Sequence, residues 1–435
     1  MSAWSPLFTR SIFTAGARVA GVVSLIVIMA VASRRMDGEE FGLFAILLVL
    51  MNFAVTLDGG LRFGLGNRLA ALSSQPESMV DSKQVFWSVF HMECLIGGLG
   101  ALACIGIMPW INWAGLFNIH SATLATESRW VFPAVCAMLM LNQPLTLAGT
   151  ALFANHHIVI ASVFGAVQSL LLMVAFWIGT FLPSFRSNCL VFFGVYLLCG
   201  VGLTVFFVFW KRWFWEWVTW RQQWAMIRSL AGPSLEFFWL SMASMASSLL
   251  GPFLAGAVGG LNMAGDFALI QRLFNLLVTV HMALLSPLSP TYTRHATRGE
   301  WERISEKLGV CVRQVWPIIF LGGGLLLIVL HPWILRIWAG RGISDYWLVV
   351  LLAVSAMIIG WANTYSVVLN SLGIVRHQAV LSVSMLVPVV GLPILLGQYF
   401  GIHGIAAAAV LCALPGAVLT MRWVHGALQQ RLVNV

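Results

Sequence analysis

Runs of apolar residues long enough to cross a lipid bilayer recur along almost the whole chain, and they restrict its fold more than any other feature. A helix needs about 20 such residues to span the hydrocarbon core. Lipid offers the backbone no hydrogen-bond partners, so spans of this kind must be helical. The predicted spans are 11–33, 41–57, 85–108, 130–151, 158–182, 189–210, 234–257, 267–289, 309–331, 346–370, 378–399 and 404–425. The sequence therefore predicts an all-α polytopic membrane protein with about 12 transmembrane helices.

The composition supports a membrane protein and excludes several other classes. Of the 435 residues, 60% are hydrophobic and 9% are charged, whereas a soluble domain carries roughly 25% charged residues. The net charge of +9 is spread over short loops instead of one patch, which argues against nucleic acid as a partner. The seven cysteines lie in apolar stretches without CxxC spacing, so they indicate packing, not disulfides or zinc ligands. These cysteines are Cys94, Cys104, Cys136, Cys189, Cys199, Cys311 and Cys412.

The distribution of Lys and Arg predicts the orientation of the spans. Of the 24 Lys and Arg residues, fifteen fall on the side of the N-terminus, six on the opposite side and three inside spans. Basic residues favour cytoplasmic loops. We therefore expect both termini in the cytoplasm.

The chain also repeats itself. A shift of 226 residues places the first three spans near spans seven to nine, and it aligns 40–43 (EFGL) with 266–269 (DFAL). Because six spans are an even number, the two halves run in the same direction, as in transporters with parallel repeats. We predict an N-terminal six-helix bundle (1–210), a linker (211–233) and a C-terminal six-helix bundle (234–435). The two pseudo-symmetric bundles are expected to surround a central cavity.

The linker region is rich in tryptophan and basic residues. Between positions 210 and 230, six tryptophans alternate with charged and amide residues. Tryptophan prefers the headgroup region, and basic residues favour the anionic cytoplasmic leaflet. We interpret the stretch as an interfacial helix that joins the halves. An alternative is that it helps to capture a lipid headgroup.

Two arginines inside spans are candidates for substrate binding. A charge at the centre of a membrane helix costs about 2.5–3.5 kcal/mol on insertion scales. Arg18 shares its helical face with small and polar residues, and the face of Arg272 continues through Asn275 and Thr279. If both face inward, they give the cavity a positive lining. The alternative is that both extend to the membrane interface.

Three acidic residues are candidates for coupling transport to an ion. Glu93 lies in the third span on a face with Gly97 and Gly100, which directs it into the bundle. It either pairs with an arginine or takes up a proton during transport. Glu236 stands at the start of the seventh span and is also consistent with a marker of the membrane edge. Asp58 precedes two glycines and is also suited to cap or break a helix.

Five stretches resemble a known family. They are 37–45 (DGEEFGLFA), 58–68 (DGGLRFGLGNR), 265–268 (GDFA), 287–294 (PLSPTYTR) and 334–340 (ILRIWAG). In their order and spacing, and in span count over the whole length, the sequence resembles the Wzx-type O-antigen flippases. These flippases form the polysaccharide-exporting branch of the multidrug/oligosaccharidyl-lipid/polysaccharide exporter superfamily.

The resemblance implies a function and a location. Such proteins translocate undecaprenyl-diphosphate-linked oligosaccharides across the bacterial inner membrane by alternating access of two halves. Arginine offers planar, always charged donors to phosphate, so Arg18, Arg272 and Arg62 become candidate ligands of the diphosphate. The partners implied are the lipid-linked oligosaccharide, membrane lipids and glycan-assembly proteins such as a polysaccharide polymerase. A monomer suffices, and no cofactor or metal is expected.

Other functions stay open. A cation-coupled multidrug or small-metabolite antiporter of the same superfamily is the main alternative, although a pump for cationic drugs favours buried carboxylates over arginines. A scaffold for a glycan-synthesis complex is a further alternative. An enzyme is not expected, because the chain has no GxxxxGK[ST] loop and no HExxH motif.

Overall fold

The computed structural model describes the backbone of residues 5–54, 56–73 and 79–433. Within these ranges it describes all side chains except those of 5–19, 73, 79–80, 231–234, 236–237, 240, 243–244, 246–249 and 432–433. The described chain contains helices and no strand. It divides into two compact units, which we call unit 1 (Met1–Phe238) and unit 2 (Trp239–Val435). The predicted domain boundaries, and the predicted cavity between the halves, stay predictions.

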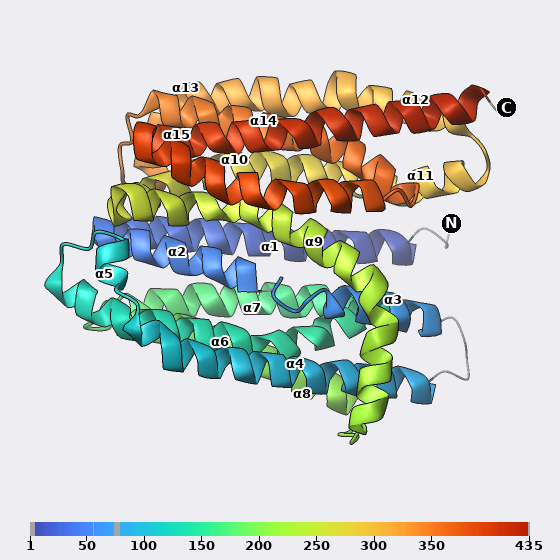
Figure 1. The fold of residues 1–435 in the computed structure, drawn as a ribbon, viewed down its shortest axis with the longest axis horizontal. Helices are drawn as coiled ribbons and strands as arrows, with labels where there is room; N and C mark the ends of the chain where they lie inside the picture. Colours follow the sequence, from blue (N-terminus) through green and yellow to red (C-terminus); the bar gives the residue numbers. More distant parts are fainter. Residues whose placement is uncertain (1–4, 55, 74–78, 434–435) are drawn as a thin grey trace. The chain divides into compact units, whose positions relative to one another are not determined.

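Unit 1 is a bundle of long helices (Figure 1). Its elements are α1 (Ser5–Arg35), α2 (Gly38–Ala54), α3 (Leu61–Ser73), α4 (Met79–Ile107), the 3-10 turn η1 (Met108–Trp110), α5 (Trp113–Leu116), α6 (Ala122–Ala154), α7 (Ile158–Gly179) and α8 (Phe185–Lys211). Helix α6 packs against α4 on one side and α8 on the other, and α7 packs against α1 and α8. Ser121 and Ser184 begin α6 and α8 as N-caps, since their hydroxyls accept backbone N–H groups of the first turn.

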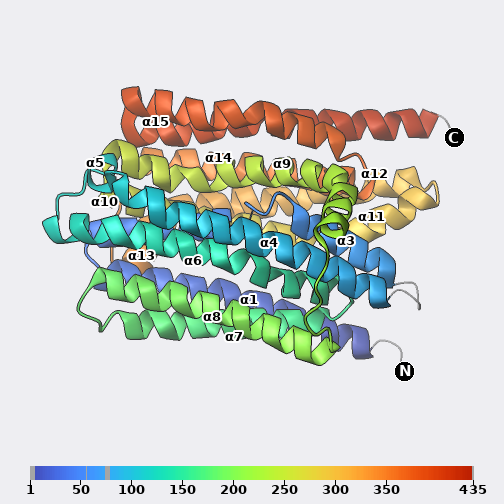
Figure 2. The same ribbon diagram turned by 60° about the horizontal axis from the view of Figure 1, so that its bottom comes forward.

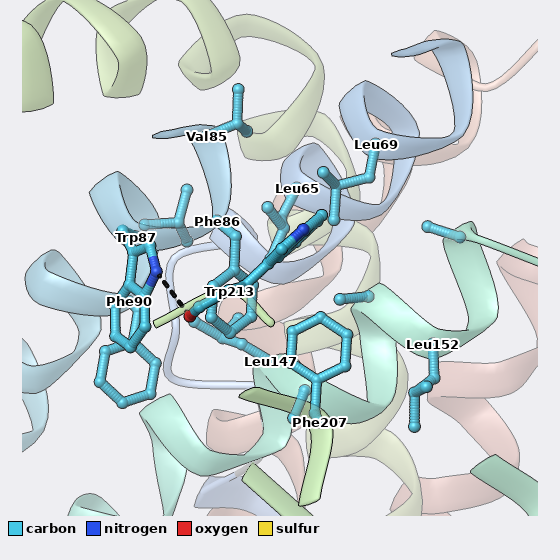
Figure 3. Packing of buried hydrophobic residues seen from close by; sticks show 14 of the residues in the cluster. Leu65, Leu69, Val85, Phe86, Trp87, Phe90, Leu147, Leu152, Phe207 and Trp213 are labelled. Carbon is cyan, nitrogen blue, oxygen red and sulfur yellow. Dashed lines mark hydrogen bonds between the residues drawn. The ribbon is translucent and has the colours of Figure 1, made fainter. Parts of the chain in front are cut away.

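An aromatic cluster holds one end of unit 1 together (Figure 3). Phe86 and Phe207 are fully buried, and Trp213 of the predicted interfacial linker packs against both. The indole N–H of Trp87 donates to the backbone oxygen of Trp213 at 3.2 Å. Trp213 is only 4% exposed, while Trp217 is 84% exposed. The linker therefore contributes to the core of unit 1 as well as to the surface.

The linker is only partly helical. Residues 213–219 have no regular secondary structure, and α9 (Trp220–Gly259) begins in the middle of the predicted interfacial helix. Arg212 ends α8 in the left-handed conformation, with φ of 53°, which turns the chain away from the helix axis. The prediction of one helix over the whole linker was therefore wrong for its first half.

Unit 2 is also a helical bundle (Figure 2). Beyond the second part of α9 its elements are α10 (Leu261–Leu285), α11 (Leu288–Thr297), α12 (Trp301–Val310), the π-helical segments η2 (Cys311–Val315) and η3 (Pro317–Gly323), α13 (Gly324–Ala339), α14 (Tyr346–Ser371) and α15 (Arg376–Val433). Helix α14 packs against α10, α11 and α15. Inside α15, Gly401 has φ of 58° and ψ of −139°, which breaks the helix into two.

The helices account for the predicted spans. Within the described residues, eight helices are long and apolar enough to cross a membrane. One of them, α15, contains two predicted spans separated at Gly401. Helix α2 has only 17 residues, and α1 and α9 include residues without described side chains. Each predicted span coincides with helical structure, and the chain is a multi-pass α-helical membrane protein.

Candidate functional site

The second predicted span of unit 1 is broken inside the bundle. Helix α2 ends at Ala54, whereas the sequence predicted that the span would continue to residue 57, and α3 begins at Leu61. Gly59 and Gly60 adopt φ of 62° and 78°, a region that residues with a Cβ rarely enter. Non-helical backbone within a membrane bundle is tolerated where it is buried in protein or lines a cavity. In transporters, broken helices of this kind often surround the binding site.

Asp58 organises the break. Its carboxylate accepts the backbone N–H of Gly60 at 2.9 Å and that of Arg62 at 3.2 Å. It also lies 3.6 Å from the guanidinium Nε of Arg62. Asp58 is 4% exposed, and these contacts supply the hydrogen bonds that a buried carboxylate requires. The capping role that the sequence suggested for Asp58 is thus confirmed.

Glu93 stands at the middle of α4. Fourteen residues of the helix precede it and fourteen follow it. Its side chain is fully buried, and neither carboxylate oxygen has a hydrogen-bond partner among the described residues. On the same face, a Cβ added at Gly97 would lie 2.5 Å from the backbone oxygen of Met140 in α6. The side chain therefore points into the bundle, where α4 and α6 approach closely, as its helical face predicted.

The broken helix and Glu93 form one polar cluster. Both Asp58 and Arg62 are close enough to Glu93 to interact with it electrostatically. Arg62 also interacts electrostatically with Tyr196 of α8. The cluster thus draws on α3, α4 and α8 and the turn before α3. It brings together three of the residues that the sequence singled out, from positions up to 35 residues apart in the chain.

A cavity of about 510 Å³ lies beside this cluster. It is formed between α6, α7 and α8. Asn142 and Tyr196 belong to its lining and lie near each other. Most of the remaining lining is apolar, for example Leu145 and Val167. The polar cluster of unit 1 therefore borders a largely apolar pocket.

The sequence analysis missed three members of this region. Gln143 donates from its amide to the backbone oxygen of Ala54, at the end of α2, and Asn142 and Tyr196 line the cavity. The Asn142-Gln143 pair inside an otherwise apolar span was a usable signal, because polar residues inside membrane spans usually face the bundle interior.

The other predicted site residues lie elsewhere. Arg272 belongs to α10 of unit 2 and is half-buried. No carboxylate of the described residues lies within 4.0 Å of it. The side chains of Arg18 and Glu236 lie outside the described residues. Among the described residues, no group of three or more His, Cys, Asp or Glu side chains is arranged to hold a metal ion.

Comparison with known proteins places the fold. No family model matches the sequence, and no curated protein matches it significantly. Solved structures match nearly its whole length. An inward-facing multidrug resistance MATE family transporter of the MOP superfamily has a TM-score of 0.71 at 12% identity, covering 95% of each chain.

Two further structures agree with this match. A MOP superfamily transporter from Pyrococcus furiosus has a TM-score of 0.65 at 14% identity and covers 97% of this chain and 95% of that chain. A mutant of the Vibrio cholerae MATE transporter VcmN has a TM-score of 0.63 at 15% identity and covers 99% of both chains. The chain thus has the fold of the MATE transporters of the MOP superfamily, with twelve transmembrane helices in two bundles.

Proposed function

We propose that this protein is a secondary transporter that carries undecaprenyl-diphosphate-linked oligosaccharides across the bacterial inner membrane by alternating access. The fold supports membrane transport, since the solved structures with this fold named above are transporters. The substrate class is supported by the chemistry of residues inside the membrane spans. We further propose that both termini face the cytoplasm and that a monomer is sufficient.

The observation that carries the substrate class is Arg272. It lies well inside α10, eleven residues after the helix begins at Leu261, and it has no carboxylate within 4.0 Å among the described residues. A guanidinium removed from water is unfavourable without a counterion. A diphosphate offers that counterion with the bidentate geometry that arginine prefers.

Arg62 is a weaker candidate for the same role. Its guanidinium already lies 3.6 Å from the Asp58 carboxylate, so part of its charge is neutralised within unit 1. We propose Arg272 as the first ligand of the diphosphate, with Arg18 as its expected counterpart in unit 1. Arg62 then contributes mainly through its neighbours Asp58 and Glu93.

Glu93 is the proposed coupling residue. Its carboxylate is buried and has no hydrogen-bond partner among the described residues, which leaves both oxygens available to a proton. Its proximity to the Asp58–Arg62 pair links its charge to the broken helix. Protonation and release at Glu93 would therefore change the electrostatic balance at the point where α2 and α3 meet. Glu236 and Asp58 remain further candidates, and for Asp58 the cap accounts for the contacts described above.

Glu93 also favours a second candidate function. A cation-coupled antiporter for drugs or small metabolites requires a buried carboxylate, and multidrug transporters are among the matched structures. For the Pyrococcus furiosus transporter, reverse polarity of the binding pocket was taken to suggest a different function. Pocket polarity is accordingly the property that separates the two candidates. Arg272, which has no carboxylate within 4.0 Å among the described residues, favours an anionic substrate.

The deciding experiment measures lipid-linked oligosaccharides by mass spectrometry in cells depleted of this protein. We expect one undecaprenyl-diphosphate species to accumulate while a surface glycan is lost. Re-expression of Arg272→Ala should fail to restore the glycan. Arg313→Ala is the matched control, because Arg313 is an exposed arginine of unit 2. An unchanged lipid-linked pool, with new sensitivity to cationic drugs, would favour the antiporter.

A further inference from the structure

A second, strongly polar pocket lies at one end of unit 1. It has a volume of about 200 Å³ and is formed where α1 and α7 end and α2, α6 and α8 begin. In both ribbon views these helix ends meet at the end of the bundle that carries α5 (Figure 2). Asp58, Arg62 and Glu93 are absent from its lining, so the pocket is distinct from the polar cluster described above.

Two carboxylates in this pocket have unused hydrogen-bonding capacity. One oxygen of Glu40 accepts the backbone N–H of Asp37 at 3.3 Å, and one oxygen of Glu127 accepts that of Arg186 at 3.0 Å. The second oxygen of each has no hydrogen-bond donor among the described residues. The charges of Glu40 and Glu127 also repel each other. These acceptors therefore favour a ligand that donates hydrogen bonds.

Asn188 provides an independent indication of a ligand. It lines the pocket and is 4% exposed. Among the described residues, its buried carbonyl oxygen has no hydrogen-bond donor and its amide nitrogen has no acceptor. The carboxamide lies against Gly179, where any side chain would collide with it. A buried polar group without a hydrogen-bond partner is unfavourable, and a ligand with adjacent donor and acceptor groups would supply the missing partners.

Arg35 restricts the kind of ligand further. It lines the same pocket, and its guanidinium lies 5.7 Å from the centre of the Phe181 ring. Among the described residues no carboxylate is within 4.0 Å of it. A simple cation would be repelled by Arg35, and a phosphate would be repelled by Glu40 and Glu127. Vicinal hydroxyl groups, which both donate and accept, satisfy all four side chains.

We propose that this pocket binds a single sugar ring. Its volume is below the roughly 300–1,000 Å³ of pockets for drug-sized ligands, which suits one ring and not an oligosaccharide. The choice of a carbohydrate rests on the proposed function. The pocket would bind one sugar of the oligosaccharide, and the arginines proposed to bind its diphosphate are not part of its lining.

Saturation-transfer NMR on the full-length protein in lipid nanodiscs tests the proposal, with glucose and N-acetylglucosamine as probes. We expect transfer to at least one sugar from the unmodified protein. Glu127→Gln should weaken binding about tenfold, because the neutral amide forms a weaker hydrogen bond with a sugar hydroxyl than the charged carboxylate does. Asn188→Leu should abolish it. Arg129→Gln is the control, since Arg129 lies near Glu127 in α6 but lines a different pocket.

Several outcomes would overturn the site. Absence of magnetisation transfer to either sugar would do so. Equal transfer in the unmodified protein and in Glu127→Gln would also do so, because this substitution preserves the shape of a half-buried side chain. A rise in melting temperature with Na⁺ or Ca²⁺ that is lost in Glu127→Gln, without sugar binding, would assign the pocket to a cation. Sugar binding in a protein whose depletion leaves the lipid-linked pool unchanged would support the site and reject the proposed function.

Discussion

The second helix of each unit shows how the two halves of the chain have diverged. In unit 1, α2 ends at Ala54 after 17 residues, and a turn separates it from α3. In unit 2, α10 runs for 25 residues to Leu285, and only Ser286 and Pro287 precede α11. Under the shift of 226 residues, the start of α3 at position 61 corresponds to position 287, one residue before α11. The order of helices is therefore repeated, whereas the non-helical turn is longer in unit 1, where it separates Ala54 from Leu61, than at the equivalent point of unit 2.

The polar residues follow the same division. Asp58, Arg62 and Glu93 correspond to positions 284, 288 and 319 under this shift, and all three are occupied by Leu or Ile in unit 2. Conversely, Arg272 corresponds to position 46, which is a fully buried isoleucine. Unit 1 therefore carries the cluster of Asp58, Arg62 and Glu93, whereas unit 2 carries Arg272, which has no carboxylate within 4.0 Å among the described residues. This asymmetry suits a transporter in which one half responds to protons and the other contacts an anionic group.

The largest effect on stability is expected at the contact of α4 with α6. Gly97→Ala places a Cβ 2.5 Å from the backbone oxygen of Met140, and overpacking of this kind costs about 1–3 kcal/mol. The corresponding residue of unit 2 is Gly323, where a Cβ would meet only the flexible end of Leu277 at 3.2 Å. Thermal unfolding in detergent should show a lower melting temperature for Gly97→Ala and little change for Gly323→Ala. Equal losses in both variants would mean that the halves pack alike.

The next effect should have the opposite sign. Glu93→Leu removes a buried carboxylate that has no hydrogen-bond partner among the described residues, and we expect the protein to become more stable by about 1–3 kcal/mol while transport is lost. Such a gain in stability at the expense of activity is typical of functional residues. The unit 2 counterpart, Ile319→Leu, should change neither. The measurements are the melting temperature and the amount of surface glycan in complemented cells. A loss of stability in Glu93→Leu would assign Glu93 a structural role.

A smaller effect is expected at the break itself. Asp58→Ala removes the cap of α3, which typically costs about 1 kcal/mol, whereas Asp58→Asn keeps an acceptor for the N–H of Gly60. In unit 2, α11 begins without a side-chain cap, so the cap has no counterpart there. Chemical or thermal unfolding should rank the variants in the order unmodified, Asp58→Asn, Asp58→Ala. If Asp58→Asn is as unstable as Asp58→Ala, the charge toward Arg62 matters more than the cap.

The sequence predicted the helices well and the polar site only in part. Apolar length is sufficient to locate spans, because the bilayer imposes one dimension on each of them. The Asp-Gly-Gly motif indicated a helix break, but not that the break would lie close to Glu93, since that depends on how α3 packs against α4. The same holds for the pocket at Asn188, whose lining comes from five helix ends. In the linker, the sequence did not predict which tryptophans would be buried, because Trp213 and Trp217 are the same residue type although one is buried and the other exposed.

The smallest effect concerns a carboxylate–histidine pair outside the spans of each unit. In unit 1, Glu39 lies 2.8 Å from the ring of His120 and accepts the backbone N–H groups of His120 and Ser121. In unit 2, Asp345 lies 2.8 Å from the ring of His403 and accepts the N–H of Leu348.

Burial alone would raise the pKa of Asp345, but hydrogen bonds from His403 and the backbone outweigh it and hold the pKa below its ordinary value of 3.8. The stability from Asp345 is therefore complete above that ordinary pKa and is lost as the pH falls through the lowered pKa of the folded state. Because the pair is partly exposed, its contribution should be at most about 1 kcal/mol.

His403→Gln should reduce the fall in melting temperature between about pH 5 and pH 2. His120→Gln should have less effect, since Glu39 keeps two backbone donors. A larger effect from His120→Gln would show that the ring, and not the backbone, holds Glu39 in its charged form.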